Sequence, residues 1–184
     1  MFISPEQYPT LAQEKAEYDL HQNSSDDIGY RKFLSRLFDP MLPKLQPHSC
    51  GLDFGSGPGP TLSVMFEEQG HRMDIYDHFY AHDPSRLAQQ YDFISASEVI
   101  EHLHCPHQDL NRLWACLKPQ GHLGIMTKRV RDSHAFAHWH YKDDLTHVCF
   151  FAIKTFEWLA NDWQATLEVM GPDVVIFTKH CVDE

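Results

Sequence analysis

Short apolar runs alternate along the chain with longer segments in which hydrophobic residues recur at helical spacing. Four of the runs predict β-strands, at 49–54, 72–77, 91–95 and 122–127. Segments of helical character lie before and between them, at 30–38, 60–68, near 85–90 and at 106–117. Because strands and helices take turns, the pattern predicts an α/β fold whose sheet is mostly parallel.

The two ends of the chain predict smaller elements around this core. Residues 1–25 are polar and rich in turn formers, and Pro40 and Pro43 are expected to end the helix that follows. After the fourth strand, the pattern predicts a helix near 155–161 and strand-like runs at 165–169 and 174–178. A Gly-Pro-Asp turn joins those two runs, which predicts an antiparallel hairpin.

The most informative stretch reads GLDFGSGPG, at 51–59. A strand there leads into a glycine-rich turn and a helix start, whose open backbone and positive dipole end suit a nucleotide-like ligand. Pro60 stands where a dinucleotide fingerprint would have its third glycine, which argues against an NAD-dependent enzyme. Asp77 ends the second strand eighteen residues after Gly59, close to where an acid bonds ribose hydroxyls in nucleotide-binding folds.

Four motifs in order resemble those of class I S-adenosylmethionine-dependent methyltransferases. They are LDFGSGPG at 52–59, the acid at Asp77, YDFISASEVIEHL at 91–103 and LKPQGHLGIMT at 117–127. Within that family the chain is most similar to a small bacterial group related to ubiquinone-biosynthesis methylases, and WHYKDDLTHVCFF at 139–151 resembles a pattern of one poorly characterised group there. The resemblance implies S-adenosylmethionine as cofactor and in-line methyl transfer to a small-molecule, or else a peptide, acceptor.

The same resemblance implies a Rossmann-like three-layer sandwich, with a mostly parallel sheet and a C-terminal antiparallel hairpin strand. We expect one methyltransferase domain over residues 1–184. Its expected parts are a helical arm and lid at 1–45, a cofactor-binding core at 48–128, a substrate-side loop at 129–152, and a closing helix and hairpin at 153–184.

Cofactor-binding residues carried over from the matching motifs gather around the glycine turn and the ends of the following strands. They are Asp53, Gly55, Ser56, Gly57, Gly59, Asp77, His78, Ser97 and Glu98. His21 is added from a Y-x-x-H-x-N element at 18–23, because this segment could fold over the cofactor. Structural roles stay open: Asp53 could cap the turn, Glu98 could be a first-turn helix acid, and 18–23 could be only a polar arm.

A polar cluster at 138–147 carries the candidate catalytic residues. It follows the fourth strand at its C-terminal end, where open α/β sheets place their ligands. His147 is the expected general base for a hydroxyl acceptor, with Asp144 as an alternative proton acceptor and Tyr141 as a pocket wall. Loop-capping hydrogen bonds are the alternative role for Asp144 and His147. A metal-dependent enzyme built on this cluster is a further alternative, but the spacing matches no common zinc signature, so we assign no metal ligand.

Composition and charge limit which substrates and cellular locations are expected. The 184 residues carry 15 basic and 26 acidic side chains, a net charge of −11, and no long basic cluster, so nucleic acid is not expected as substrate. No apolar run approaches the roughly 20 residues that cross a membrane, and no secretory signal is visible. Five scattered cysteines without C-x-x-C pairs are typical of a reducing cytosol. We therefore expect a cytoplasmic enzyme. A catalytically silent cofactor-binding module is the alternative, and the oligomeric state stays open.

Overall fold

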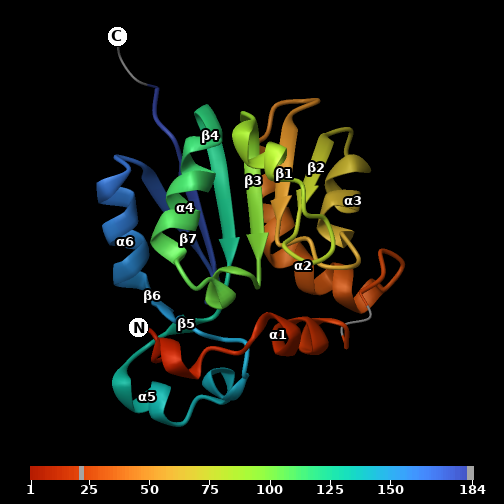
Figure 1. Cartoon of the computed structure of the whole chain (residues 1–184). Helices are drawn as coiled ribbons and strands as arrows, with labels where there is room; N and C mark the ends of the chain where they lie inside the picture. Colours follow the sequence, from red (N-terminus) through yellow and green to blue (C-terminus); the bar gives the residue numbers. More distant parts are fainter. Residues whose placement is uncertain (21–22, 182–184) are drawn as a thin grey trace.

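A six-stranded sheet forms the centre of the protein, whose computed structural model describes residues 1–20 and 23–181. The strand order is β2-β1-β3-β4-β8-β7 (Figure 1). Neighbours among the first four are parallel, whereas β8 is antiparallel to both β4 and β7. The strands are β1 (Cys50–Phe54), β2 (Arg72–Tyr76), β3 (Tyr91–Ser97), β4 (Leu117–Met126), β7 (Thr166–Met170) and β8 (Val174–Thr178). The predicted Rossmann-like α/β fold with a C-terminal antiparallel hairpin is confirmed.

Helices cover both faces of the sheet and make it the middle of three layers (Figure 1). One face carries α2 (Ile28–Met41) and α3 (Thr61–Glu67), and the other carries α4 (Pro106–Ala115) and α6 (Ile153–Asp162). Successive residues of a strand point to opposite faces. In β3, Phe93 therefore packs with α2 and α3, while Ile94 packs with α4 and α6. Burial on both faces explains why this strand reads as an apolar run.

The carboxyl edge of the parallel strands is covered by segments from far apart in the sequence. Figure 1 shows α1 (Leu11–Tyr18) and α5 (Ser133–Ala137) at this edge, below the arrowheads of β3 and β4. A small sheet of β5 (Arg129–Val130) and β6 (Phe151–Ala152) accompanies them. The amino group of Met1 donates a hydrogen bond to the carbonyl of Phe150 at 2.9 Å, so the first residues are anchored there. The 3₁₀ helices are η1 (Pro5–Gln7), η2 (Leu42–Lys44), η3 (Pro84–Ala88), η4 (Ile100–His102) and η5 (His140–Asp143).

Three elements differ from those expected by more than two residues or in type. The helix α2 is not ended by Pro40 but continues to Met41. Pro40 removes one backbone N–H from the helix. The helix tolerates this loss, because the Leu42 amide again donates a hydrogen bond to the carbonyl of Phe38. The helix expected near 85–90 is the short 3₁₀ helix η3. Strand β4 begins at Leu117 rather than at 122, because Leu117 pairs with Tyr91 across an irregularity in β3.

Candidate active site

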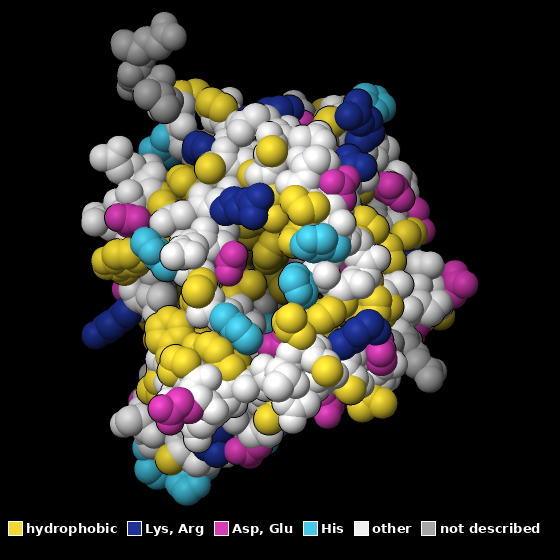
Figure 2. Space-filling model, in the orientation of Figure 1, with side chains coloured by type: hydrophobic (Ala, Val, Ile, Leu, Met, Phe, Trp, Pro, Cys, Tyr) yellow, Lys and Arg dark blue, Asp and Glu magenta, His cyan; other side chains and the backbone are white. Residues whose placement is uncertain are grey.

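A cavity of about 920 Å³ opens at the carboxyl edge of the parallel strands. Figure 2 shows a hollow near the middle of one face, surrounded by hydrophobic side chains and histidines. Small-molecule sites span about 300–1,000 Å³, so the volume suits a large ligand or two smaller ones. Of the residues that the sequence indicated, the cavity is lined by Gly55, Ser56, Gly57, Asp77, His78, Ser97, Glu98, Tyr141, Asp144 and His147. Asp53 and Gly59 do not line it, and His21 lies outside the described residues.

The glycine turn after β1 leaves bare backbone in the cavity wall. Gly55 and Gly57 have φ angles of +76° and +63°, in the region that favours glycine. A Cβ atom on Gly55 would lie 2.2 Å from Val99, so this glycine permits close packing of two strand ends. A Cβ atom on Gly57 would meet no atom closer than Asn23 Nδ2, at 4.0 Å. Gly57 therefore leaves an open cradle that a side chain would fill.

Asp77 ties the glycine turn to the loop after β2. Its Oδ2 accepts a hydrogen bond from the Gly57 amide at 2.9 Å, and its Oδ1 accepts from the amides of Phe79 and Tyr80 at 2.8 and 3.1 Å. A carboxylate has about four acceptor positions. Three are used, so one is left for a ligand hydroxyl in the cavity.

Asp53 lies beneath the turn and has a different environment. It is 3% exposed, and its oxygens accept hydrogen bonds from Ser95 and Ser63 at 2.9 and 3.1 Å. Burial raises the pKa of Asp53 to about 6, although the two serine hydroxyls oppose the shift. Its contacts join β1, β3 and α3. Gly59 also has a structural role, because it lets the backbone of the N-terminal segment pack closely against the turn. A Cβ atom on Gly59 would lie 2.2 Å from the carbonyl oxygen of Asn23.

The N-terminal segment closes over the cavity through polar and aromatic contacts. Tyr18, on α1, packs its ring against Phe79 at 5.7 Å and against His102 at 5.4 Å between ring centroids. Tyr80 donates a hydrogen bond to Asp19 at 2.6 Å. Tyr80 belongs to the loop after β2 that begins with Asp77. This loop therefore holds both the segment after α1, through Asp19, and the glycine turn, through Gly57.

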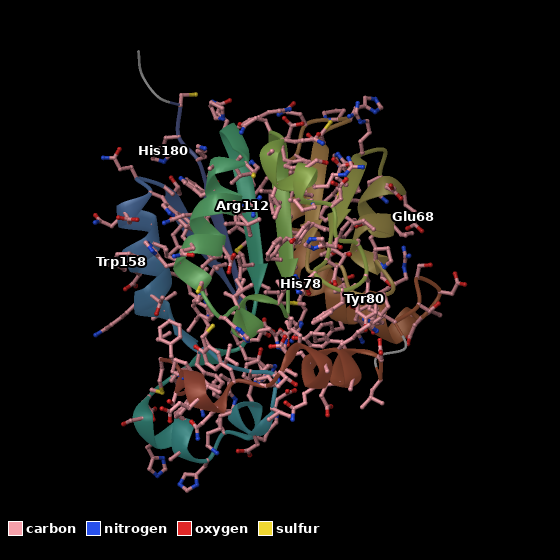
Figure 3. All side chains as sticks on the ribbon, viewed as in Figure 1. Glu68, His78, Tyr80, Arg112, Trp158 and His180 are labelled. Carbon is pink, nitrogen blue, oxygen red and sulfur yellow. The ribbon has the colours of Figure 1, made fainter. Side chains whose placement is uncertain are left out.

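Two residues of α4 enter the cavity wall although the sequence pattern predicted only a core helix. Asp109 and Arg112 line the cavity from the edge of the apolar stripe of α4, with Asp109 one helical turn before Leu113. In Figure 3, Arg112 on α4 and His78 after β2 lie on the face that carries the hollow. Charged residues beside a core stripe are usually only solvated, so the sequence held no signal that set these two apart.

Two carboxyl groups follow β3, that of Glu98 half-buried and that of Glu101 fully buried. Glu98 adopts φ +50°, and one of its oxygens, Oε1, is buried without a hydrogen-bond partner among the described residues. Glu101 is fully buried; its Oε1 accepts a hydrogen bond from the Tyr141 hydroxyl, and its Oε2 has no partner among the described residues. Burial raises the pKa of both groups, and the charge of Glu101 adds to the shift at Glu98.

Two histidine rings lie above these acids with a fixed tautomer. His147 Nδ1 is 2.6 Å from the carbonyl oxygen of Tyr141, and His102 Nδ1 is 2.9 Å from that of Thr146. A carbonyl oxygen only accepts, so each Nδ1 carries the proton and each Nε2 holds the lone pair of the neutral ring. Burial lowers the pKa of His147, which favours the neutral ring. Asp144 Oδ2 lies 3.8 Å from His147 Nε2.

Comparison with known families agrees with this arrangement. The profile of the family described as "Methyltransferase domain" matches residues 27–168. The chain belongs to this methyltransferase family. Membership confirms the expected enzyme class and its cofactor, S-adenosylmethionine. A search of curated proteins found no match to the methyltransferase. Within the described residues, no helix is both long and apolar enough to cross a membrane.

Solved structures share the fold at low sequence identity. An O-methyltransferase family protein from Burkholderia thailandensis matches with a TM-score of 0.63 and 12% identity, over 97% of this methyltransferase and 66% of that protein, just under two thirds of its length. The 1,6-didemethyltoxoflavin-N1-methyltransferase of the same organism was solved with bound 1,6-didemethyltoxoflavin and S-adenosylhomocysteine. It matches with a TM-score of 0.56 and 17% identity, over 99% of this methyltransferase and 94% of that protein. A Thermotoga maritima S-adenosylmethionine-dependent methyltransferase is described as a possible histamine N-methyltransferase. It matches with a TM-score of 0.56 and 13% identity, over 93% of this methyltransferase and 96% of that protein.

Proposed function

We propose that this methyltransferase transfers the methyl group of S-adenosylmethionine to a small-molecule acceptor by in-line displacement. The observation that supports this most is one cavity lined both by the bare backbone at Gly57 and by the side chains of Tyr141, Asp144 and His147. Its volume of about 920 Å³ accommodates a cofactor together with a small second ligand. A 1,6-didemethyltoxoflavin methyltransferase with the same fold offers a precedent for such an acceptor.

The cofactor side of the cavity follows from the turn and the strand ends. The ligand would lie against Gly55 and Gly57, and a ribose hydroxyl would donate to the remaining acceptor position of Asp77. His78 would flank the same ligand, while Ser97 and Glu98, after β3, would face its methionine part. When bound, the cofactor supplies a methyl group on a positively charged sulfur that leaves readily.

The residues after β4 would hold the acceptor. Tyr141 walls the cavity, and Asp144 is fixed by hydrogen bonds from the Thr146 amide and hydroxyl, at 2.9 and 2.7 Å. Alignment of the acceptor and exclusion of water contribute several kcal/mol or more. His147 is oriented by Tyr141, so its Nε2 would accept the proton if the acceptor is a hydroxyl.

Two alanine variants test the cofactor assignment. Gly57 and Gly171 have nearly the same φ, +63° and +64°, and neither leaves a Cβ atom in a clash, but only Gly57 lines the cavity. Both substitutions therefore cost similar backbone strain, about 1–2 kcal/mol. S-adenosylhomocysteine at a hundred times its Kd should stabilise the wild type and Gly171→Ala by about 2.7 kcal/mol, but should not stabilise Gly57→Ala. NAD should stabilise none of them. Equal stabilisation of both variants would overturn the assignment.

Turnover separates an enzyme from a silent cofactor-binding module. The wild type is incubated with methyl-labelled S-adenosylmethionine and a panel of small hydroxyl, amine and carbon acceptors. We expect label in one product class and an equal amount of S-adenosylhomocysteine. Binding of the cofactor without transfer to any acceptor class would favour the silent module.

A further inference from the structure

The cluster of Glu101, His102 and His147 has the composition and the spacing of a metal site. One ligand-capable atom from each residue lies within 4.8 Å of the other two. The histidine ring centroids are 4.8 Å apart. Two imidazoles and a carboxylate are a donor set that suits first-row divalent cations better than Mg²⁺ or Ca²⁺, which prefer oxygen ligands alone.

Glu101 gives an independent reason to place a cation there. Its side chain is fully buried, yet Oε2 has no hydrogen-bond partner among the described residues. Glu98 interacts with it electrostatically and adds a half-buried carboxyl group whose buried Oε1 also has no partner in the described part of the chain. Because Tyr141 bonds only Oε1, the other oxygen has lost its hydration without gaining a partner, which destabilises the folded state. A cation held against Glu101 would satisfy its open oxygen and offset the charge of both acids.

The groups around the three residues hold them in the orientation that metal ligands need. Each histidine donates its Nδ1–H to a backbone carbonyl, which leaves Nε2 as the coordinating nitrogen and fixes the ring. Tyr141 supports two of the three ligands, because its hydroxyl donates to Glu101 and its carbonyl accepts from His147. The carbonyl of Glu101 accepts hydrogen bonds from the amides of Val148 and Cys149, at 2.9 and 3.0 Å. These bonds join the segment after β3 to the segment after β4.

We propose that Glu101, His102 and His147 bind a divalent cation of the Zn²⁺, Co²⁺ or Mn²⁺ type, which holds a hydroxyl oxygen of the methyl acceptor. The acceptor part of this proposal rests on the proposed function; the cation site does not. Cation binding lowers the pKa of a coordinated hydroxyl. The acceptor oxygen then bonds to the methyl carbon, the carbon–sulfur bond breaks with its electron pair staying on sulfur, and the hydroxyl proton passes to solvent. The substrate class is an alcohol or phenol, and His147 is a ligand instead of the general base.

Metal titration tests the site without any methyl acceptor. Chelator-treated protein is titrated with Co²⁺, followed by its visible spectrum, and with Zn²⁺ by calorimetry. We expect one cation per chain in the wild type. Tyr141→Phe should weaken binding about 10–100-fold, and removal of a ligand in Glu101→Gln, His102→Gln or His147→Gln should weaken it further. His138, exposed in the same histidine-rich segment, is the matched control, and His138→Gln should bind Co²⁺ as the wild type does.

Thermal stabilisation by S-adenosylhomocysteine is measured on every variant, so a variant that fails to fold is recognised. Wild-type Co²⁺ affinity in the folded His147→Gln and His102→Gln proteins would overturn the metal site, whatever the cofactor result. Metal binding without S-adenosylhomocysteine binding would leave the site intact and contradict the proposed function. With both bound, catechol, a small ligand with two adjacent hydroxyls, should change the Co²⁺ spectrum. An unchanged spectrum would overturn the role in holding the acceptor.

Discussion

Asp53 is buried beneath the glycine turn, and the energetic cost of burying it should appear in the pH dependence of stability. Burial raises its pKa from 3.8 to about 6. Each pKa unit corresponds to about 1.4 kcal/mol, so ionising Asp53 costs the folded state about 3 kcal/mol. Because the folded-state pKa is the higher one, the stabilising contribution is fully present below pH 3.8 and is lost as pH rises through 6. About 2 kcal/mol of that loss falls between roughly pH 4.5 and 7.5.

Asp53→Asn isolates this effect, because the amide retains the shape and can bond both serines: its oxygen accepts from Ser95, and its NH₂ group donates to Ser63. The free energy of unfolding is measured in urea from pH 4.5 to 7.5 for the wild type and the variant. The stability of the variant relative to the wild type should rise by about 2 kcal/mol across that range. Asp39→Asn, which removes an exposed carboxylate on α2, should show no such trend. Parallel pH curves for the wild type and Asp53→Asn would refute the assigned cost of burial.

Three further substitutions or modifications have expected outcomes. Gly59→Ala forces a Cβ atom into the backbone of the N-terminal segment at Asn23, so we expect a loss of about 1–3 kcal/mol in urea unfolding. We also expect weaker S-adenosylhomocysteine binding; unchanged binding would show that the segment does not contribute to holding this ligand. In Gly124→Ala the new Cβ atom would lie 2.1 Å from Met41 Sδ, so the buried side chains of Met41 and Leu37 on α2 must repack. We expect a cost of about 1–3 kcal/mol in the same assay, and a wild-type midpoint would contradict this packing. Burial raises the pKa of Cys149 to about 12, so a thiol reagent should label Cys149 only after unfolding. Cys105 is exposed in the cavity wall and should react in the native protein, at a lower rate when S-adenosylhomocysteine is present. Mass spectrometry of the labelled peptides checks both outcomes.

The fold was predictable because its main signals are local. The run from Tyr91 to Ser97 is buried on both faces, so its apolar character marks a central strand. Gly55 and Gly57 take positive φ angles that few other residues adopt, so the turn was recognisable from its glycines. Asp77 was recognisable because a strand end fixes its place, and its three hydrogen bonds show how the turn depends on it.

The rest of the site depends on contacts between segments distant in the sequence. Nothing near Glu101 in the sequence indicates that its carbonyl bonds to Val148 and Cys149, or that its carboxyl meets Tyr141. On sequence alone, Glu98 is expected near the cofactor or as a first-turn helix acid, and no role is assigned to Glu101 or His102 in the same motif. The polar cluster at 138–147 was recognised as rich in potential ligands, yet only His147 of its histidines joins the three-residue cluster. His140 lines the same cavity without joining that cluster, and His138 is exposed outside the cavity lining.

The cavity wall has two parts, one formed mainly by backbone at the glycine turn and one formed by side chains after β4. This difference affects how the specificity for the methyl acceptor can change. The cofactor part depends on backbone geometry at Gly55 and Gly57, which tolerates almost no substitution. The part after β4 consists of side chains on a 3₁₀ helix and loop from 139 to 147, outside the central sheet. Changes there would alter the part of the cavity that we propose holds the methyl acceptor, without moving β1 or β2. We therefore expect related acceptors to be distinguished by residues 139–147, while cofactor affinity is set by the turn and Asp77.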